Sequence, residues 1–405
     1  MWFRTTRAYK KGYPSQNICV IRHGCYPDDP RVYKEVRALY GAGYFVDVIC
    51  LGGSTAKRKE TIDGVHVYRV FHSHKRGSLL RYFYEYTLSF VKMFVLLTVL
   101  FFRRGYDCIQ VNTLPDPLVF VTIIPWLFGV KVLLDMHEPA PELFLTVYGP
   151  AKYNLVYRLL VLMEKVSIKY ASQVLTVNET LRQRLIERGA SGHKIHVVRN
   201  VPDEVFSANV SGHEYGKHPV ILTHGTILKR YGQEVLIRAV ALLRDIGKNF
   251  QLFIVGDGEN AKEVRSLTER LGCSDMVSFV GRVPFSKVGE YIEKADIGVV
   301  PLLDSAFSEL CQPNKLFEYA ACKKPVIVSR LRAVEETFDD SCVMFFEPGD
   351  HKDLARCIVE LYENPEKRHE LAENAYRQYE KIRWRETKNI YLKVIHDLVA
   401  KKKKE

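Results

Sequence analysis

The sequence predicts an α/β protein built from two doubly wound parallel sheets. Short apolar runs that suit buried strands alternate with amphipathic helical patterns along almost the whole chain. A polar stretch, residues 207–218, interrupts this alternation near the middle of the chain. The length of 405 residues is enough for two domains, each with its own core.

The first series of apolar runs predicts a doubly wound domain over residues 1–206. Its strand candidates are QNICVIRHG, FVDVICLGG, VHVYRVF, CIQVNT, KVLLDMHE, SQVLTVNE and KIHVVRN. Helical patterns such as RVYKEVRALYGAG and ETLRQRLIERGA stand between most of them, as expected for crossover helices on a parallel sheet.

The second series predicts another such domain over residues 219–375, with residues 207–218 as the linker. Its strand candidates are PVILTHGT, FQLFIVGDG, MVSFVGRVP, DIGVVPL, KPVIVSR and CVMFFEPG. Residues 376–405 carry long helical patterns and a basic tail, and we expect them to return to the first domain. Ligands of such sheets bind at the carboxyl ends of the strands, so we expect two domains facing each other across a ligand-binding cleft.

The charge and cysteine content narrow the classes of partner and compartment. A net charge of +12 implies an anionic partner. No zinc-finger spacing, RNA-binding strand or KH-type clamp accompanies the basic clusters, which favours a membrane surface over nucleic acid. Nine cysteines without a CxxC pair, and an N-terminus without the apolar segment of a signal peptide, predict a cytoplasmic protein.

Residues 86–104, YTLSFVKMFVLLTVLFFRR, form the most apolar segment of the chain. The 17 residues before the closing arginine pair would extend about 26 Å as a helix, less than the ~30 Å of a bilayer core. The segment also stands between two predicted strands, so we do not expect it to span a membrane. One interpretation is a crossover helix buried wholly against the sheet. The other, favoured by the flanking Arg81, Arg103 and Arg104, is peripheral contact with the anionic inner face of the plasma membrane.

The stretch CQPNKLFEYAACKKPVI, residues 311–327, places a cation in the first turn of a short helix. Pro313 suits the first helical position, because it lacks the N–H that would have no partner there. Lys315 then lies near the positive end of the helix dipole, which is unfavourable unless an anion binds there too. With Glu318 one turn later, the pattern indicates a phosphorylated ligand that carries hydroxyl groups. A solvated surface helix is the alternative interpretation.

The loop LTHGTILKRYGQEVLIRAV follows the first predicted strand of the second domain. Gly225 would let the backbone approach a phosphate closely, and Lys229 and Arg230 stand just before the next helix. Either cation could neutralise a diphosphate, and arginine could do so with two parallel hydrogen bonds. An ordinary basic turn is the alternative interpretation.

The stretch FIVGDGENA contains Gly256, Gly258 and Ala261 in a spacing that also occurs in dinucleotide-binding loops. The next strand, MVSFVGR, ends without the acidic residue that would hold a ribose, and the match lies in the second domain. An oxidoreductase is therefore disfavoured.

The stretch KVLLDMHEPAPELF places titratable groups at the exit of a buried strand of the first domain. Asp135, His137, Glu138 and Glu142 are poised there to reach a ligand. A histidine with a purely structural role is the alternative, and its place at the strand end favours the functional interpretation.

Five of these segments together resemble the retaining glycosyltransferases of family 4, which have the GT-B fold of two Rossmann-like domains facing across a cleft. They are DDPRVYKEVRALYGAGYFVDV, the GT..KRYGQEVLIRA loop, IVGDGE, VSFVGRVP and PNKLFEYAACKKPVI, in the order of the family. The resemblance extends from about residue 16 to about residue 375, and it is uninformative about the sugar.

The resemblance implies roles for individual residues. Glu318 matches the second glutamate of the Glu-x7-Glu motif, which binds the ribose of a nucleotide sugar, and Arg230, with Lys229 as the alternate, matches the position that holds the diphosphate. The first glutamate of the motif should stand at position 310, which is Leu310. Either the neighbouring Glu309 serves instead, or that role has been lost.

Other positions follow from the same resemblance. Arg282, after Gly281, falls where the nucleobase is contacted, and His137 matches a histidine that touches the donor sugar near the reacting carbon. The remaining candidates are the helix start beneath the phosphates (Asn314, Lys315 and Leu316), the loop glycines (Gly225 and Gly256) and the acceptor-side carboxylates (Asp29 and Glu142).

The implied activity is transfer, with retention of configuration, of a sugar from a nucleoside diphosphate to a lipid-linked or surface-polysaccharide acceptor at the cytoplasmic membrane face. Under this interpretation, the candidate catalytic residues are His137, Arg230 and Glu309. No dedicated nucleophile is recognisable, and no DxD motif stands at a strand end, so we expect neither a cofactor nor a metal. The alternatives are a non-catalytic subunit that binds nucleotide sugars, which Leu310 makes conceivable, and a nucleotide-sugar isomerase of GT-B fold.

Overall fold

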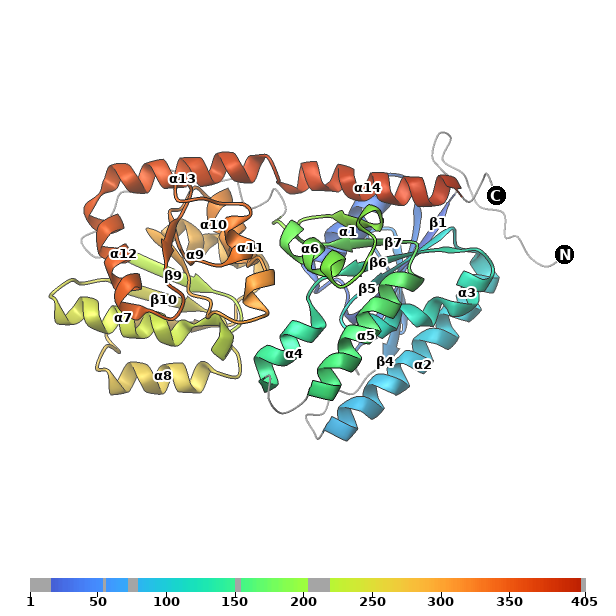
Figure 1. Ribbon diagram of the computed structural model, residues 1–405, viewed down its shortest axis with the longest axis horizontal. Helices are drawn as coiled ribbons and strands as arrows, with labels where there is room; N and C mark the ends of the chain where they lie inside the picture. The colour runs from blue at the N-terminus through green and yellow to red at the C-terminus, as the bar shows by residue number, and fades with distance from the viewer. Residues whose placement is uncertain (1–15, 54–55, 72–78, 150–153, 203–218, 402–405) are drawn as a thin grey trace. The chain divides into compact units, whose positions relative to one another are not determined.

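The computed structural model describes residues 16–53, 56–71, 79–149, 154–202 and 219–401. They form two compact α/β units (Figure 1). Unit 1 comprises the chain up to Val177, Leu181–Val198 and the segment from Thr387 onward, and unit 2 comprises Asn178–Thr180 and Arg199–Glu386. The expected linker, residues 207–218, lies outside the described residues, as do the basic residues at 7, 10, 11, 74–76 and 402–404.

Unit 1 contains a sheet of eight described strands in the order β3-β4-β2-β1-β5-β6-β7-β8. All neighbours are parallel except β3 and β4. The strands are β1 (Asn17–Cys25), β2 (Phe45–Gly52), β3 (Lys59–Ile62), β4 (Val65–Phe71), β5 (Cys108–Asn112), β6 (Lys131–Met136), β7 (Gln173–Thr176) and β8 (Ile195–Val197).

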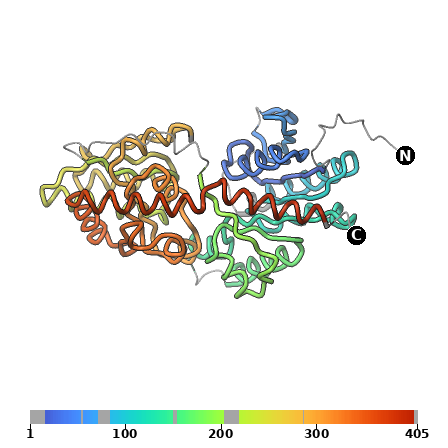
Figure 2. The backbone as a smooth tube through the Cα atoms, turned by 90° about the horizontal axis from the view of Figure 1, so that it is seen from above, coloured from blue at the N-terminus to red at the C-terminus, as the bar shows by residue number. Residues whose placement is uncertain are grey.

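The helices of unit 1 cover both faces of its sheet. They are α1 (Pro30–Gly41), α2 (Leu79–Arg104), η1 (Asp116–Thr122), α3 (Ile123–Leu127), α4 (Ala140–Tyr148), α5 (Asn154–Tyr170), α6 (Glu179–Glu187), η2 (Gly192–Lys194) and α14 (Trp384–Lys401). The connection through α1 runs towards one edge of the sheet, whereas those through α2, η1–α3 and α4–α5 run towards the other. Because such crossovers are right-handed, α1 lies on one face and the other three connections lie on the opposite face. Figure 2 shows α14, in red, lying along unit 1.

Unit 2 contains six described strands, all parallel, in the order β11-β10-β9-β12-β13-β14. The strands are β9 (Val220–His224), β10 (Gln251–Val255), β11 (Val277–Gly281), β12 (Ile297–Val300), β13 (Val326–Ser329) and β14 (Met344–Phe346). The helices are η4 (Lys229–Tyr231), α7 (Gln233–Asp245), α8 (Ala261–Arg270), η5 (Phe285–Lys287), α9 (Val288–Lys294), η6 (Ser308–Leu310), α10 (Asn314–Ala321), α11 (Arg332–Glu335), α12 (His351–Glu363) and α13 (Pro365–Glu380).

The strand order of each sheet reverses at one point, and polar loops follow the strands at that point. In unit 1 the reversal lies between β1 and β5, and in unit 2 it lies between β9 and β12. Ligands of open parallel sheets bind beyond the carboxyl ends of the strands at such a point. The fold therefore predicts ligand-binding residues in the loops after β5 and the neighbouring β6 in unit 1, and in the loop after β9 in unit 2.

The structure differs from the expected elements in several details. Helix α10 begins at Asn314, one residue later than expected, with Pro313 at the N-cap. The pattern over 352–380 is two helices, because Asn364 and Pro365 end α12 and start α13. The short edge strand β3, in the basic AKRKE region, was not expected.

The unit boundary also lies earlier than residue 207, and only the segment from Thr387 belongs to unit 1. Residues 178–180 join unit 2 because Asn178 Nδ2 donates to Leu310 O at 2.9 Å and Glu336 accepts hydrogen bonds from the backbone N–H and hydroxyl of Thr180.

Candidate functional site

The loop after β9 places a glycine against a lysine. Gly225 has a φ of +102°, which favours glycine, and its N–H donates to Val255 O at 2.8 Å. A Cβ atom at this position would lie 3.8 Å from the ammonium nitrogen of Lys315. Because Gly225 has no side chain, the ammonium group of Lys315 is accessible from this side.

Lys315 is a cation in the first turn of α10, as the sequence predicted. Burial lowers the pKa of its ammonium group to about 8, and the carboxylate of Glu318 opposes that effect. The ammonium nitrogen also lies 5.4 Å from the centre of the Tyr231 ring. Neither the dipole nor the burial favours a cation here, so a bound anion would stabilise it.

The carboxylate of Glu318 lies one turn further along α10 and is nearly buried. Its Oε2 atom is 3.3 Å from Nε2 of His224, the last residue of β9. Burial, and next the nearby Lys315, lower the pKa of His224 to about 3, so this histidine is neutral at neutral pH. The ring of His224 also packs edge-on against Tyr319, with 5.1 Å between ring centres. Glu318 is therefore held beside a neutral ring at the end of β9.

Arg230 lies in η4, close to two aromatic rings. Its guanidinium carbon is 4.9 Å from the centre of the Tyr231 ring and 5.4 Å from that of Phe307. Its backbone carbonyl accepts a hydrogen bond from Leu303 N at 3.0 Å, which holds the loop. Among the described residues, no hydrogen-bond acceptor contacts its buried Nε atom. The guanidinium of Arg230 could therefore still donate hydrogen bonds to a ligand such as a diphosphate. The alternate cation, Lys229, is exposed.

The glycines of the β10 loop have a packing role. A Cβ on Gly256 would lie 1.9 Å from Gly225 O, and one on Gly258 would lie 2.1 Å from Ile227 O. Ile227 N also donates to Asp257 O at 3.1 Å. The loops after β9 and β10 therefore touch through their backbones, and this contact accounts for the GxG spacing without a dinucleotide.

The remaining donor-side candidates lie around this loop pair and α10. Arg282 is exposed just after β11, and Gly281 O accepts from Gly256 N at 2.8 Å. Asn314 is exposed and its Oδ1 accepts from Asn200 Nδ2 at 3.1 Å. The side chain of Leu316 is fully buried, so only its backbone could face a ligand.

The position expected for the first glutamate of the motif is part of the core. Leu310 is 1% exposed, and its carbonyl accepts from Asn178 Nδ2. Glu309 is partly exposed in η6, and its Oε2 atom accepts from the backbone N–H of Arg332 at 3.3 Å. Burial raises the pKa of Glu309, and that N–H opposes the effect. Glu309 is thus the carboxylate of this segment that solvent can reach.

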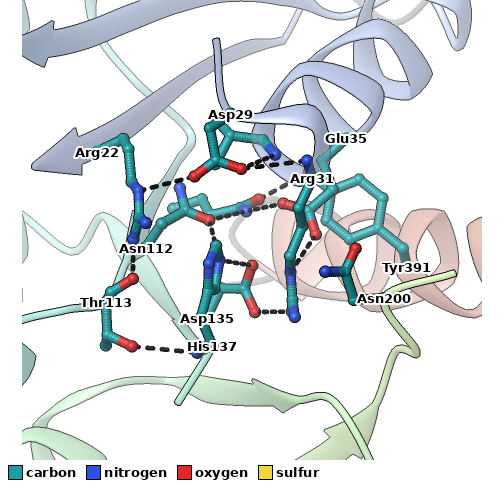
Figure 3. Close-up of polar contacts among 12 residues, drawn as sticks. Arg22, Asp29, Arg31, Glu35, Asn112, Thr113, Asp135, His137, Asn200 and Tyr391 are labelled. Atoms are coloured by element: carbon teal, nitrogen blue, oxygen red, sulfur yellow. Dashed lines mark hydrogen bonds and ion pairs between the residues drawn. The ribbon is translucent and has the colours of Figure 1, made fainter. Parts of the chain in front are cut away.

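Unit 1 gathers a buried polar cluster at the ends of β5 and β6 (Figure 3). Arg31, in the first turn of α1, pairs with Asp135 and also donates from Nε to Glu35 at 3.2 Å. Gln110 donates from Nε2 to Glu35 at 2.8 Å and to Asn112 at 3.0 Å. The cluster therefore joins the start of α1 to two strand ends.

His137 lies at the edge of this cluster. Its Nε2 atom is 3.0 Å from Asp135 Oδ2 and 3.3 Å from Asn112 Oδ1, both of them acceptors. This environment assigns the ring proton to Nε2 and leaves Nδ1 as an acceptor. Burial, followed by the positive charge of Arg31, lowers the pKa of His137 to about 4 although Asp135 opposes the shift. A neutral histidine with a free acceptor lone pair suits a sugar hydroxyl.

The two acceptor-side candidates lie in different surroundings. Asp29 caps α1, accepting from the backbone N–H groups of Arg31 and Val32, and pairs with Arg22 at 3.0 Å. Arg22 in turn donates to Thr113 O, and Thr113 Oγ1 accepts from His137 N at 3.1 Å, so Asp29 belongs to the His137 cluster.

Glu142 does not belong to that cluster. It is buried and pairs with Arg188, which also bonds Glu164 at 2.9 Å. A carboxylate held in this way stabilises α4 and α5 against α6, and the geometry gives no support to a role in acceptor binding.

The sequence reasoning missed several members of the His137 cluster, namely Arg31, Glu35, Gln110, Asn112, Thr113 and Tyr391. The polar run after the strand CIQVNT was a signal for Asn112 and Thr113, and the four-residue spacing of Arg31 and Glu35 was a signal for an ion pair on α1. Among the described residues, no group of three or more His, Cys, Asp or Glu side chains could hold a metal ion.

Two family models match the chain. A glycosyl transferase 4-like domain matches residues 29–201, and the glycosyl transferases group 1 model matches residues 208–378. The amylovoran biosynthesis glycosyltransferase AmsK of Erwinia amylovora is 26% identical over 192 residues, which are 46% of this chain and 47% of that protein. The chain spans about half the length of the curated relatives it matches.

Solved structures match nearly the whole chain. The sucrose-phosphate synthase of Thermosynechococcus elongatus superimposes with a TM-score of 0.76 at 18% identity, covering 95% of this chain and 99% of that one. HepE of Anabaena, in complex with UDP and glucose, superimposes with a TM-score of 0.68 at 17% identity, covering 94% and 98%. These likenesses show the fold, two Rossmann-like parallel-sheet units. Together with the two family models, they show that this chain belongs to the group 1 glycosyltransferases of the GT-B type.

Proposed function

We propose that the protein transfers a sugar from a nucleoside diphosphate sugar to a hydroxyl group of a lipid-linked or surface-polysaccharide acceptor, with retention of anomeric configuration. The surroundings of Lys315 are the observation that supports the donor half of the proposal. Lys315 is a partly buried cation in the first turn of a helix, its pKa is lowered to about 8, and it faces Gly225, where a side chain is absent. Such a cation is stabilised by an anion, and a diphosphate is the anion that this fold family implies.

The side chains around Lys315 suit the rest of a nucleoside diphosphate. The Arg230 guanidinium can donate hydrogen bonds to the phosphates, and the Glu318 carboxylate is suited to accept hydrogen bonds from ribose hydroxyls. Arg282 is exposed at the end of the neighbouring β11 and is available to a nucleobase.

The reaction requires stabilisation of negative charge on the departing diphosphate. In the proposed step the bond between the anomeric carbon and the diphosphate oxygen breaks, and the acceptor oxygen bonds to that carbon on the same face. The acceptor proton passes to an oxygen of the leaving diphosphate, so no enzymic nucleophile is needed. Fixed cations and helix N–H groups lower the barrier because they are already oriented where the charge develops. On this account Arg230, Lys315 and the first turn of α10 serve the leaving group without a metal.

His137 is proposed to act on the sugar side of the reaction. With its proton on Nε2 and its pKa near 4, the ring is neutral and can accept a hydrogen bond from a donor-sugar hydroxyl through Nδ1. Because Asp135 is fixed by Arg31, the ring orientation is set before the substrate arrives.

A non-catalytic subunit that binds nucleotide sugars is a second candidate. The observation that favours it is the buried Leu310, which removes one of the two glutamates of the motif. A nucleotide-sugar isomerase of the same fold is a further alternative within enzymes, and it would convert the donor without any acceptor.

The test is a turnover assay with the full-length protein, a panel of nucleoside diphosphate sugars and a cell lipid extract, with products identified by mass spectrometry. Transfer predicts a glycosylated product and one released nucleoside diphosphate for each sugar moved. Donor binding without release of the diphosphate in any arm would identify a non-catalytic binding protein. An altered nucleotide sugar formed without extract would identify an isomerase.

A further inference from the structure

Helix α2 carries a stripe of exposed apolar side chains along its length. Val91, Val95, Val99 and Phe102 are 50%, 53%, 41% and 64% exposed, and they recur every three or four residues. That spacing places them on one side of the helix. The opposite side packs on the domain through Met93, Leu97 and Leu100, all of them buried.

The same face of unit 1 carries two further groups of exposed apolar side chains. On and after α3 they are Ile123, Trp126, Leu127 and Phe128, and on α5 they are Leu155, Val156, Leu159, Leu162 and Val166. Leu155 is 81% exposed and Leu127 is 65% exposed. Three adjacent structural elements thus expose large apolar groups, whereas scattered single ones are the rule on a soluble protein.

These three groups are continuous. Both α2 and α5 pack on η1, and α3 directly follows η1, on the sheet face opposite α1 (Figure 1). The ring of Phe128 lies 5.6 Å from that of Phe102 on α2. The ring of Trp126 lies 5.2 Å from that of Tyr170 at the end of α5. We call the exposed apolar residues of α2, α3 with Phe128, and α5 the apolar face.

The charges around the apolar face have one sign. The exposed charged side chains of these helices, over their described residues, are all basic: Lys92, Arg103, Arg158, Lys165 and Lys169. Glu85 on α2 is half-buried, and Glu164 on α5 is buried against Arg188. A positive rim around an apolar face complements an anionic lipid surface and repels a second copy of the same face.

Helix α2 lies in a position that excludes a crossing of the bilayer. Tyr84–Arg104 is long and apolar enough to span a membrane by length and composition, the one such stretch in the described part of the chain, and 22% of its most apolar window is buried. The expectation of a helix too short to span was therefore wrong, as was the alternative of a wholly buried helix. However, α2 joins β4 to β5 of one sheet, so a crossing would separate paired strands.

We propose that the apolar face of unit 1 docks onto an anionic lipid bilayer, with α2, α3 and α5 lying in the plane of the interface. The apolar side chains enter the boundary between headgroups and acyl chains, and the basic rim contacts the anionic headgroups. Docking would bring a lipid-linked acceptor close to the enzyme, and this consequence rests on the proposed function. The docking itself does not depend on the proposed function.

The two arginines that end α2, Arg103 and Arg104, are not equally suited to a charge-reversal test. Arg104 donates to Asp47 at 3.0 Å, so reversing its charge would damage the fold. Arg103 and Lys165 are exposed on different helices and are suitable positions instead. Ile246 and Lys262 are exposed on unit 2 and provide matched controls for an apolar-to-glutamate change and a charge reversal.

The experiment is flotation of the full-length protein with phosphatidylcholine vesicles, with and without phosphatidylglycerol. We expect recovery on the anionic vesicles to exceed that on neutral ones by about tenfold or more. Val95→Glu with Leu159→Glu should abolish recovery. Each charge reversal at Arg103 or Lys165 should weaken binding about fivefold or more. Ile246→Glu and Lys262→Glu should float like the wild type.

Two further measurements complete the test: light scattering gives the oligomeric state, and a transfer assay with a water-soluble acceptor gives the turnover without a membrane. The proposal is overturned if no vesicle recovers the protein, if neutral and anionic vesicles recover it equally, or if the face variants float like their controls. A dimer interface on the apolar face would also overturn the proposal. In that case the wild type would be a dimer, Val95→Glu with Leu159→Glu would make it a monomer, and flotation would be unchanged. Flotation without donor turnover would refute the proposed function alone, and turnover without flotation would refute the docking alone.

Discussion

The Nε2 atom of His137 lies 3.0 Å from the carboxylate of Asp135, which is itself paired with Arg31. The three side chains form a row from the start of α1 to the end of β6 (Figure 3). Arg31 keeps the carboxylate ionised, and the carboxylate sets the tautomer of the histidine. The lowered pKa of His137, about 4, makes the ring a neutral acceptor instead of a cation at neutral pH.

His137→Ala should lower kcat by about 10² while the dissociation constant for the donor changes by less than about threefold, because the ring is proposed to act beside the reacting carbon. The rate of the wild-type enzyme should show no inflection from this histidine near pH 6.5. Steady-state kinetics from pH 5 to 8, with His193→Ala as an exposed control, provides the measurement. An unchanged kcat would return His137 to a structural role.

Tyr391 of α14 connects the C-terminal helix to the same cluster. Its hydroxyl donates to Gln110 Oε1 at 2.7 Å, and Gln110 donates to Glu35. Tyr391→Phe leaves a buried carbonyl oxygen without this donor, so the free energy of unfolding should fall by about 1–3 kcal/mol. Urea denaturation measures the change, and Tyr376→Phe is the control. Equal midpoints for the two variants would show that the bond does not stabilise α14.

The lowered pKa of Lys315 predicts pH-dependent binding of the nucleotide. Only the charged lysine attracts the diphosphate, and a bound anion raises its pKa, so binding takes up a proton near pH 8. Affinity for a nucleoside diphosphate should therefore fall about tenfold between pH 7 and pH 9, where the phosphates themselves stay ionised. Titration calorimetry is the measurement. Lys315→Met should bind weakly with a flat profile, and a wild type with a flat profile would contradict the assignment.

The glycine at position 256 tests the packing explanation of the GxG spacing. Its φ is +140° and a Cβ would lie 1.9 Å from Gly225 O, so Gly256→Ala should destabilise unit 2 by about 1–3 kcal/mol even without nucleotide. Gly289→Ala, in helix α9 with open space around it, should be neutral or stabilising. Thermal unfolding of the ligand-free protein separates them. Normal stability of Gly256→Ala would argue that this glycine serves a ligand instead.

The architecture could be predicted from the sequence because fully buried parallel strands such as NICVI and KVLLDM leave unbroken apolar runs. The two-unit arrangement followed from the order of those runs. Strand β3 could not be predicted, because its pattern KETI is polar and half-exposed and it exists through pairing with β4. The length of α2 was underestimated because its first turns, LLRYFYE, carry charges that hide the start of the helix.

The candidate site could be predicted where the residues that contact each other are also close in sequence. Lys315 and Glu318 lie on one helix, so their spacing specifies how they face each other. The cluster at His137 depends on pairs such as Arg31 with Asp135 and Gln110 with Tyr391, which are far apart in sequence and meet only through the sheet. Glu142 depends on a distant residue in the same way: its position after a strand suggested a ligand, whereas its carboxylate pairs with Arg188, the residue after α6.

The most direct test of the central claim is the rate of sugar transfer by Glu318→Gln and Arg230→Ala, each compared with wild type and with Lys262→Ala as the control. Under the proposed function, Glu318→Gln weakens the hold on the ribose, and Arg230→Ala removes positive charge beside the leaving diphosphate. The account predicts that each variant loses about 10² to 10³ in rate while the control stays near wild type. Near-normal turnover in both variants, with the fold intact, would contradict the assignment of the donor site to unit 2.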